Sequence, residues 1–146
     1  MSEVKNDFYT QYRGSFTSLL KWQNLDNFWR LLLKNDEPCW YVYDTGKPPP
    51  AVTLSADEFR NFIQFIDHHL RDLHKHDYCG IVYTDSKTKP TFIKIYDPKN
   101  LGVSCGIGPE PIPPGWIISL TEPLTIEKIP PLTPPKKPWW KRLLRF

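Results

Sequence analysis

The feature that most constrains the fold is an amphipathic segment that begins at Ser55. Ser55 and Glu58 have the spacing of a capping box, in which each side chain accepts a hydrogen bond from the other residue's backbone N–H. Apolar residues then recur at helical spacing, at positions 59, 62, 63, 66, 70 and 73. The pattern predicts a helix over 55–75 with one apolar face, and that face needs a surface on which to pack.

Short segments rich in aromatic and β-branched residues supply that surface. They predict strands at 39–44, 78–84, 91–97 and 115–120. The connection at 85–90 has turn composition, so we expect the second and third of these strands to form a hairpin. Weaker patterns indicate further strands at 51–54, 101–106 and, as an edge strand, 124–129. A second amphipathic helix is expected within 17–34, with its apolar face formed by Leu25, Phe28, Trp29 and Leu32.

These elements predict an α+β fold, with two helices packed on one face of a mostly antiparallel sheet of about four to six strands. Hydrophobic residues make up 40% of the chain, which suffices for a packed core. We expect a flexible lead-in over 1–15, a single domain over 16–129 and a distinct segment over 130–146. Ten of the 16 prolines lie between Pro109 and Pro138. The start of the last segment is therefore expected to be an extended, semi-rigid, Pro-rich spacer.

The strongest functional signal is the C-terminal peptide KKPWWKRLLRF, which combines two tryptophans with five basic residues and no acidic one. Tryptophan and arginine are favoured at the centres of protein interfaces. We expect a small non-enzymatic interaction or adaptor module whose C-terminal peptide docks on a protein partner. The residues expected to make that contact are Trp139, Trp140, Arg142, Leu143 and Leu144.

Two other binding surfaces for this peptide remain as alternatives. Tryptophan, leucine and cationic side chains are also typical of a short helix that lies on an anionic membrane surface. Alternatively, the peptide packs on its own domain and shows only its charges to solvent. An uncovered tail of this composition would favour aggregation, so we expect something to cover it.

An enzymatic alternative centres on Cys105, which lies between Ser104 and Gly106 in a glycine-containing segment. A cysteine nucleophile needs a nearby base and amide donors for an oxyanion. His69, from the histidine-rich end of the 55–75 helix, is the candidate base. The competing interpretation is a buried structural thiol.

A metal site is the third alternative, because all four histidines lie between 68 and 76. His74, His76 and Cys79 carry ligand types that zinc prefers. Histidines near a helix C-terminus also complement the helix dipole without any metal. We expect no cofactor.

Charge and cysteine usage bear on location and partners. Five of the 19 basic residues and none of the 16 acidic ones lie in 136–146, so the other 135 residues carry 14 and 16, a net charge of −2. We do not expect duplex nucleic acid as a partner of such a body. Three well-separated cysteines and an N-terminus without an apolar signal core lead us to expect a cytoplasmic protein.

The strand over 91–97 raises one further question about exposure. Phe92, Lys94 and Tyr96 alternate with apolar residues and share one face of that strand. If the helices cover only the opposite face, these side chains form an exposed aromatic surface suited to a peptide or single-stranded nucleic acid. The alternative is that other parts of the chain cover them.

Overall fold

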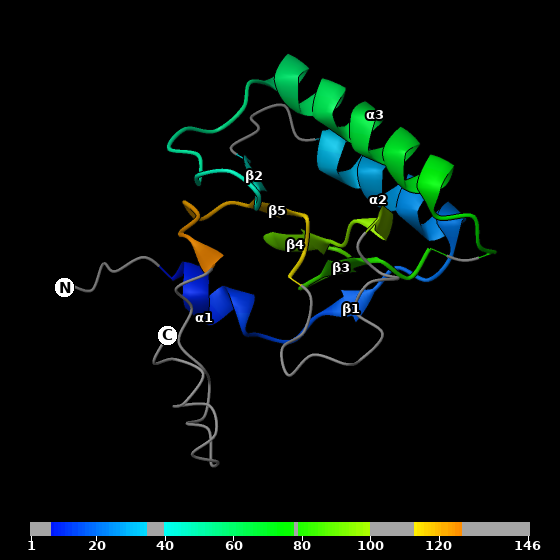
Figure 1. Ribbon diagram of the computed structural model, residues 1–146, viewed down its shortest axis with the longest axis horizontal. Helices are drawn as coiled ribbons and strands as arrows, with labels where there is room; N and C mark the ends of the chain where they lie inside the picture. The colour runs from blue at the N-terminus through cyan, green and yellow to red at the C-terminus, as the bar shows by residue number, and fades with distance from the viewer. Residues whose placement is uncertain (1–6, 35–39, 78, 100–112, 127–146) are drawn as a thin grey trace, which may run out of the picture.

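The computed structural model describes residues 7–34, 40–77, 79–99 and 113–126. Within these ranges the chain forms three helices and five strands (Figure 1). In chain order they are α1 (Phe8–Tyr12), β1 (Thr17–Ser18), α2 (Trp22–Leu33), β2 (Tyr41–Asp44), α3 (Ala56–Leu73), β3 (Val82–Thr84), β4 (Phe92–Ile95) and β5 (Trp116–Ser119). The predicted strand at 101–106 and the segment from 130 onward lie outside the described residues.

The five strands form one sheet in the order β1-β3-β4-β5-β2, and every neighbouring pair is antiparallel. The expected hairpin is present, since β3 pairs with β4 through Val82 opposite Ile95 and Thr84 opposite Ile93. The predicted α+β class, with helices against an antiparallel sheet, is therefore confirmed.

The helices α2 and α3 lie side by side over one face of the sheet (Figure 1). The capping box that opens α3 is present: Ser55 Oγ accepts from Glu58 N at 3.1 Å, and Glu58 Oε1 accepts from Ser55 N at 2.8 Å. The residues that α3 buries recur at helical spacing and are Phe59, Ile63, Ile66 and Leu70. They pack into one core with the buried face of α2 and with Ile93, Ile95 and Ile118 of the sheet.

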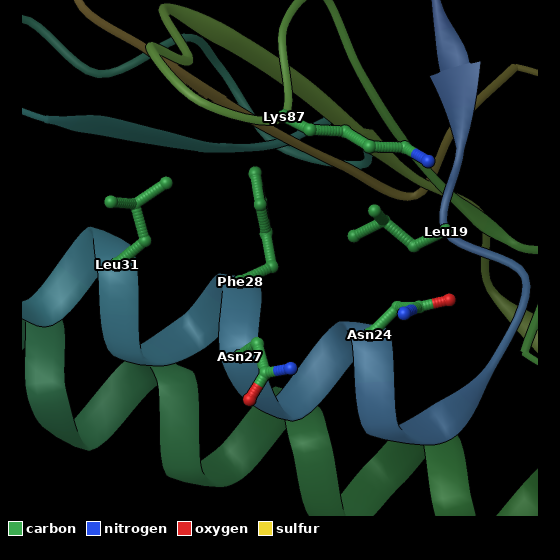
Figure 2. Close-up of a pocket in the computed structure, with 6 residues that line it drawn as sticks. All are labelled: Leu19, Asn24, Asn27, Phe28, Leu31 and Lys87. Carbon is green, nitrogen blue, oxygen red and sulfur yellow. The ribbon is translucent and has the colours of Figure 1, made fainter.

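A small groove of about 190 Å³ remains between α2 and the β3–β4 hairpin (Figure 2). Its lining residues are Leu19, Asn24, Asn27, Phe28, Leu31 and Lys87. In Figure 2, Phe28 and Leu31 rise from α2 toward the hairpin, and Lys87 extends from the hairpin toward Leu19. We call this feature the α2 groove.

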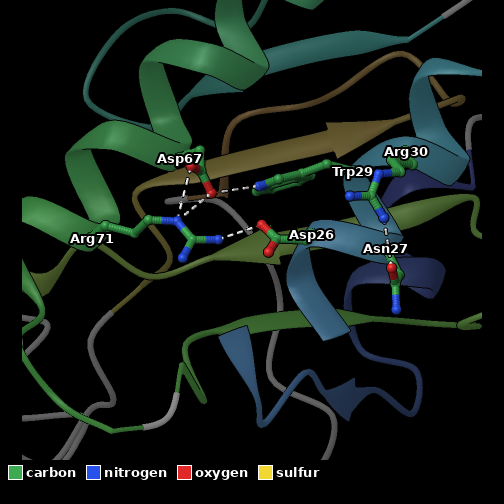
Figure 3. Close-up of polar contacts among 6 residues, drawn as sticks. All are labelled: Asp26, Asn27, Trp29, Arg30, Asp67 and Arg71. Carbon is green, nitrogen blue, oxygen red and sulfur yellow. Dashed lines mark hydrogen bonds and ion pairs between the residues drawn. The ribbon is translucent and has the colours of Figure 1, made fainter. Parts of the chain in front are cut away.

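A polar network joins α2 to α3 along the seam between them (Figure 3). Arg71 Nε donates to both oxygens of Asp67 at 3.0 and 2.9 Å, and Arg71 Nη2 donates to Asp26 Oδ1 of α2 at 2.5 Å. Trp29 Nε1 also donates to Asp67 Oδ1, at 3.0 Å. One guanidinium thus links carboxylates on both helices, which fixes how the helices sit against each other.

The opposite face of the sheet is covered by α1 (Figure 1). Phe8 of α1 is fully buried and packs with three sheet residues, Tyr43, Phe92 and Ile117. We expected a flexible lead-in over 1–15, but from residue 7 onward the structure has a packed helix there. The physical reason is that this face is itself apolar and buries the aromatic residues of α1.

Two segments that were weakly predicted to be strands have no strand conformation in their described residues. Residues 51–54 form no strand, although Leu54 N donates to Trp40 O at 3.0 Å. Residues 124–126, the described part of the predicted edge strand, are not a strand either. Leu124 and Ile126 instead pack beside α1. Their alternating apolar pattern is thus explained by packing on the sheet face covered by α1 rather than by strand pairing.

Candidate functional site

The flank of α3 that faces away from α2 carries aromatic residues. Around a helix of 3.6 residues per turn, Phe62, Phe65 and His69 fall on one side of the buried stripe. Asp67 and Arg71, which contact α2, fall on the other side. The flank with the aromatic residues has no helix packed against it among the described residues.

Two of these side chains, Phe65 and His69, contact Trp116, the first residue of β5. Phe65 stacks on His69 with 5.8 Å between ring centroids, and both approach Trp116, at 6.4 Å and 5.3 Å. Phe62 lies 6.3 Å from Phe65. Phe65 nevertheless remains 54% exposed. We call Phe62, Phe65, His69 and Trp116 the α3 aromatic patch.

A histidine–aspartate pair forms one edge of the patch. His69 Nε2 lies 3.1 Å from Asp97 Oδ1, and both side chains are largely shielded from solvent. Asp97 Oδ1 also accepts from Lys99 N at 3.0 Å. The backbone of Gly115 passes so close that an added Cβ would lie 3.1 Å from Asp97 Cβ. The carboxylate is therefore held by two hydrogen-bond partners, and the backbone of Gly115 packs against the rest of the residue.

That pairing fixes the state of the imidazole when it is neutral. A carboxylate accepts a hydrogen bond, so Nε2 carries the proton and Nδ1 keeps its lone pair. Nδ1 has no hydrogen-bond partner among the described residues. A histidine oriented by a carboxylate in this way can take a proton from a neighbouring group.

Negative charge borders the aromatic patch. Besides Asp97, Asp44 lies next to Trp116, because the two residues are register partners on β2 and β5. Asp44 Oδ1 accepts from Gly46 N at 3.0 Å, which holds the carboxylate at the end of β2. A large apolar surface with carboxylates at its border suits a ligand that combines apolar and cationic groups.

The two histidines and the cysteine of the alternative metal site do not form a group of metal ligands, among themselves or with another described side chain. His74 Nε2 lies 2.9 Å from Cys79 O, a backbone atom. Cys79 is buried, and burial raises the pKa of its thiol, which disfavours the thiolate that a metal binds. Burial lowers the pKa of His74 and so favours its neutral imidazole, which by itself does not oppose metal binding. In the described part of the chain no three His, Cys, Asp or Glu side chains are close enough to hold a metal ion.

The sheet face that carries Lys94 is covered rather than exposed, as the second of our two interpretations held. Lys94 Nζ donates to Tyr12 O at 2.7 Å and lies 4.0 and 4.2 Å from the ring centres of Tyr12 and Phe16. Burial lowers the pKa of Lys94 to about 8 and, with nearby Tyr96 and Tyr43, raises the pKa of Tyr12 to about 12. The covering element is α1.

Several predicted site residues fall outside the described ranges. They are Cys105 and the five residues of the C-terminal peptide: Trp139, Trp140, Arg142, Leu143 and Leu144. His69 is described and lies in the α3 aromatic patch. The patch itself was missed by sequence reasoning, which assigned Phe62 to the buried face. Phe62, Phe65 and His69 extend the aromatic and apolar residues of the helix beyond the stripe that packs on the core. This spacing was the signal in the sequence that could have indicated the patch.

No family model matches the chain, and comparison with the curated proteins and with the solved structures gives no significant match. Among the described residues, none of the helices combines the length and the apolar character needed to cross a membrane.

Proposed function

We propose that this protein is a non-enzymatic interaction module that binds a protein partner through the α3 aromatic patch and the C-terminal peptide. The observation that carries the proposal is the exposure of Phe65, which stays 54% accessible within a cluster of four rings on a well-formed helix. Clustered exposed aromatic side chains are typical of protein-binding surfaces and are otherwise an aggregation liability.

The chemistry of the patch indicates what a partner presents to it. Its rings provide apolar area, and Asp44 and Asp97 place negative charge beside Trp116. A partner segment that pairs a leucine or an aromatic residue with an arginine or lysine would satisfy both features. The expected contact is therefore a short amphipathic segment with basic residues.

The C-terminal peptide would supply the second contact. Trp139, Trp140, Leu143 and Leu144 would act as anchors and Arg142 as the charge contact, held away from the domain by the prolines before them. Linking two weak contacts raises the overall affinity through effective concentration. We further propose a cytoplasmic location, where unpaired cysteines stay reduced.

The proposal is tested by substituting Phe65. Full-length protein, Phe65→Glu, Val52→Glu and a chain ending at Pro135 would be used to capture partners from a lysate. The captured protein would then be purified and its affinity measured by calorimetry. We expect Phe65→Glu to weaken binding about 30-fold, as loss of an interface anchor does. Val52 is 71% exposed and outside the patch, so Val52→Glu is the matched control.

The truncated chain distinguishes the three surfaces to which the C-terminal peptide could bind: a partner protein, its own domain or a membrane. Loss of partner affinity on truncation supports the two-contact module. If a synthetic KKPWWKRLLRF peptide instead shifts the NMR signals of Phe65 and Trp116 in the truncated chain, the tail covers its own domain. A tryptophan blue shift that requires anionic vesicles and the tail would show a membrane-binding protein. Either of the last two results without partner binding contradicts the proposal.

One observation favours a second candidate, a cysteine-dependent enzyme. Asp97 orients the imidazole of His69, as a third group orients the base in such a site. In this alternative, Nδ1 takes the thiol proton of Cys105 and generates the nucleophilic thiolate. The measurement is the rate at which Cys105 reacts with iodoacetamide at neutral pH, followed by mass spectrometry. Fast alkylation that slows strongly in His69→Gln and Asp97→Asn would favour the enzyme. A rate unchanged by both substitutions would exclude this role for His69.

A further inference from the structure

The α2 groove is separate from the α3 aromatic patch and has its own chemistry. Its floor is apolar and consists of Leu19, Phe28 and Leu31. Polar groups border it from two elements: Asn24 and Asn27 from α2, and Lys87 from the β3–β4 hairpin (Figure 2). The groove therefore has an apolar floor and a polar border, to which both α2 and the β3–β4 hairpin contribute.

In the two asparagine side chains the oxygen is already engaged, whereas the N–H groups remain available to a ligand. Asn24 Oδ1 accepts from Lys21 N at 3.2 Å, and Asn27 Oδ1 accepts from Arg30 Nη1 at 2.9 Å. Each amide oxygen is thus engaged within α2 or at its start, which leaves each Nδ2 group to donate elsewhere. Lys87 is exposed and makes no ion pair among the described residues. The border of the groove consequently offers two amide donors and one ammonium.

Most of the exposed charged residues around the groove are basic. The exposed charged residues at and along α2 are Lys21, Arg30 and Lys34, and the hairpin adds Lys89 beside Lys87. The acidic residues nearby have other partners. Asp85 accepts from Thr91 N, Thr91 Oγ1 and Phe92 N, and Asp26 is bound to Arg71 on the far side of α2. Basic side chains therefore outnumber acidic ones around the groove, on a body whose net charge is slightly negative.

From this combination we propose that the α2 groove binds an acidic peptide segment of a protein partner. One apolar side chain of the peptide rests on Phe28 and Leu31. The carboxylate of a neighbouring aspartate or glutamate accepts hydrogen bonds from Lys87 Nζ and the asparagine amides. Charge-assisted bonds of this kind are the stronger ones in proteins. This second site does not depend on the α3 aromatic patch.

The size of the groove favours a peptide side chain over a complete small molecule. Sites for drug-sized ligands enclose about 300–1,000 Å³. The α2 groove holds about 190 Å³, enough for one leucine-sized side chain with its carboxylate neighbour. Asn24, Asn27 and Lys87 are all exposed, so the rest of a peptide can leave the groove toward solvent.

The test uses ¹⁵N-labelled full-length protein and three probes, with binding followed by NMR. The probes are acetyl-Gly-Leu-Glu-Gly-amide, the same peptide with glutamine in place of glutamate, and N-acetyl-leucine amide, which has no carboxylate. We expect the glutamate peptide to shift the side-chain amide signals of Asn24 and Asn27. The glutamine peptide should bind about 10-fold more weakly, because it lacks the charge that strengthens each hydrogen bond.

Two lysine substitutions provide the matched comparison. Lys87→Met should weaken binding of the glutamate peptide about 10-fold, and Lys89→Met, two residues away and outside the groove lining, should change it less than about 2-fold. Both side chains are exposed, so neither change threatens folding. Three results would each overturn the proposal: no shift at Asn24 and Asn27, equal binding by Lys87→Met and the unmodified protein, or N-acetyl-leucine amide binding as tightly as the glutamate peptide.

Discussion

At the scale of single residues, Lys94 shows two opposing effects. Its ammonium donates to Tyr12 O and lies over two aromatic rings, and both contacts favour the charged form. Burial works against the charge and lowers the pKa to about 8, from an ordinary value of 10.5. The pKa of Lys94 is thus lowered by desolvation, although these two contacts are present.

This balance predicts a pH dependence of stability. Between pH 8 and pH 10.5 the unfolded chain binds more protons at Lys94 than the folded chain does, so this group makes stability rise with pH. Tyr12, with its pKa raised to about 12, acts in the opposite direction above pH 10. The useful window is therefore pH 8 to 10.

The measurement is urea unfolding of the unmodified protein and of Lys94→Met at pH 8, 9 and 10. The free energy of unfolding of the unmodified protein, relative to the variant, should increase across this series. Taking the difference between the two proteins cancels other titrating groups, such as Cys79. A difference that stays constant or falls would show that the folded-state pKa of Lys94 is not lowered.

At the scale of elements, the join between α2 and α3 depends on Arg71. Replacing it with methionine leaves the carboxylates of Asp26 and Asp67 without their shared cation. The network is partly exposed, so we expect a loss of about 1–2 kcal/mol, between the values for surface and buried pairs.

Thermal and urea unfolding of Arg71→Met check this value. Lys75→Met is the control, because Lys75 makes an exposed pair with Asp72 at 4.0 Å, and it should cost less than about 0.5 kcal/mol. Equal stability of Arg71→Met and Lys75→Met would mean that apolar packing alone holds the two helices together.

Elements with local signals were predictable, and those without were not. The start of α3 is specified by Ser55 and Glu58, three residues apart, and the β3–β4 hairpin by the turn residues between its strands. In contrast, α1 has five residues, a length that is not stable alone. It forms because the sheet offers an apolar face, and no local pattern reports that.

The same reasoning explains what was missed in the candidate site. His69 comes from α3, Asp97 from the segment after β4, and Trp116 from the start of β5. Only the strand order brings them together. Sequence reasoning selected His69 as a base, but it had no means of finding Asp97 as its partner. Contacts between residues far apart in sequence require the topology, which the spacing of residues does not fix.

At the scale of the whole molecule, the sheet is covered on both faces, and the cover formed by α1 is the smaller one. Phe8 is 0% exposed and contacts Tyr43 and Phe92 at ring-centroid distances of 6.4 and 5.3 Å. Tyr9 Oη donates to Thr125 O at 2.8 Å, which joins α1 to a segment after β5. The two ends of the described chain thus meet on this face.

Truncating Phe8 should therefore affect the entire domain. Phe8→Ala removes a fully buried ring, and we expect a loss of about 3–5 kcal/mol, a large share of the roughly 5–15 kcal/mol typical of a domain. Leu20→Ala, at a side chain 60% exposed, should change stability by less than about 0.5 kcal/mol. If Phe8→Ala unfolds at the same urea concentration as Leu20→Ala, α1 is a peripheral attachment and the core under α2 and α3 is sufficient. If it unfolds much earlier in a single transition, both faces of the sheet belong to one cooperative unit.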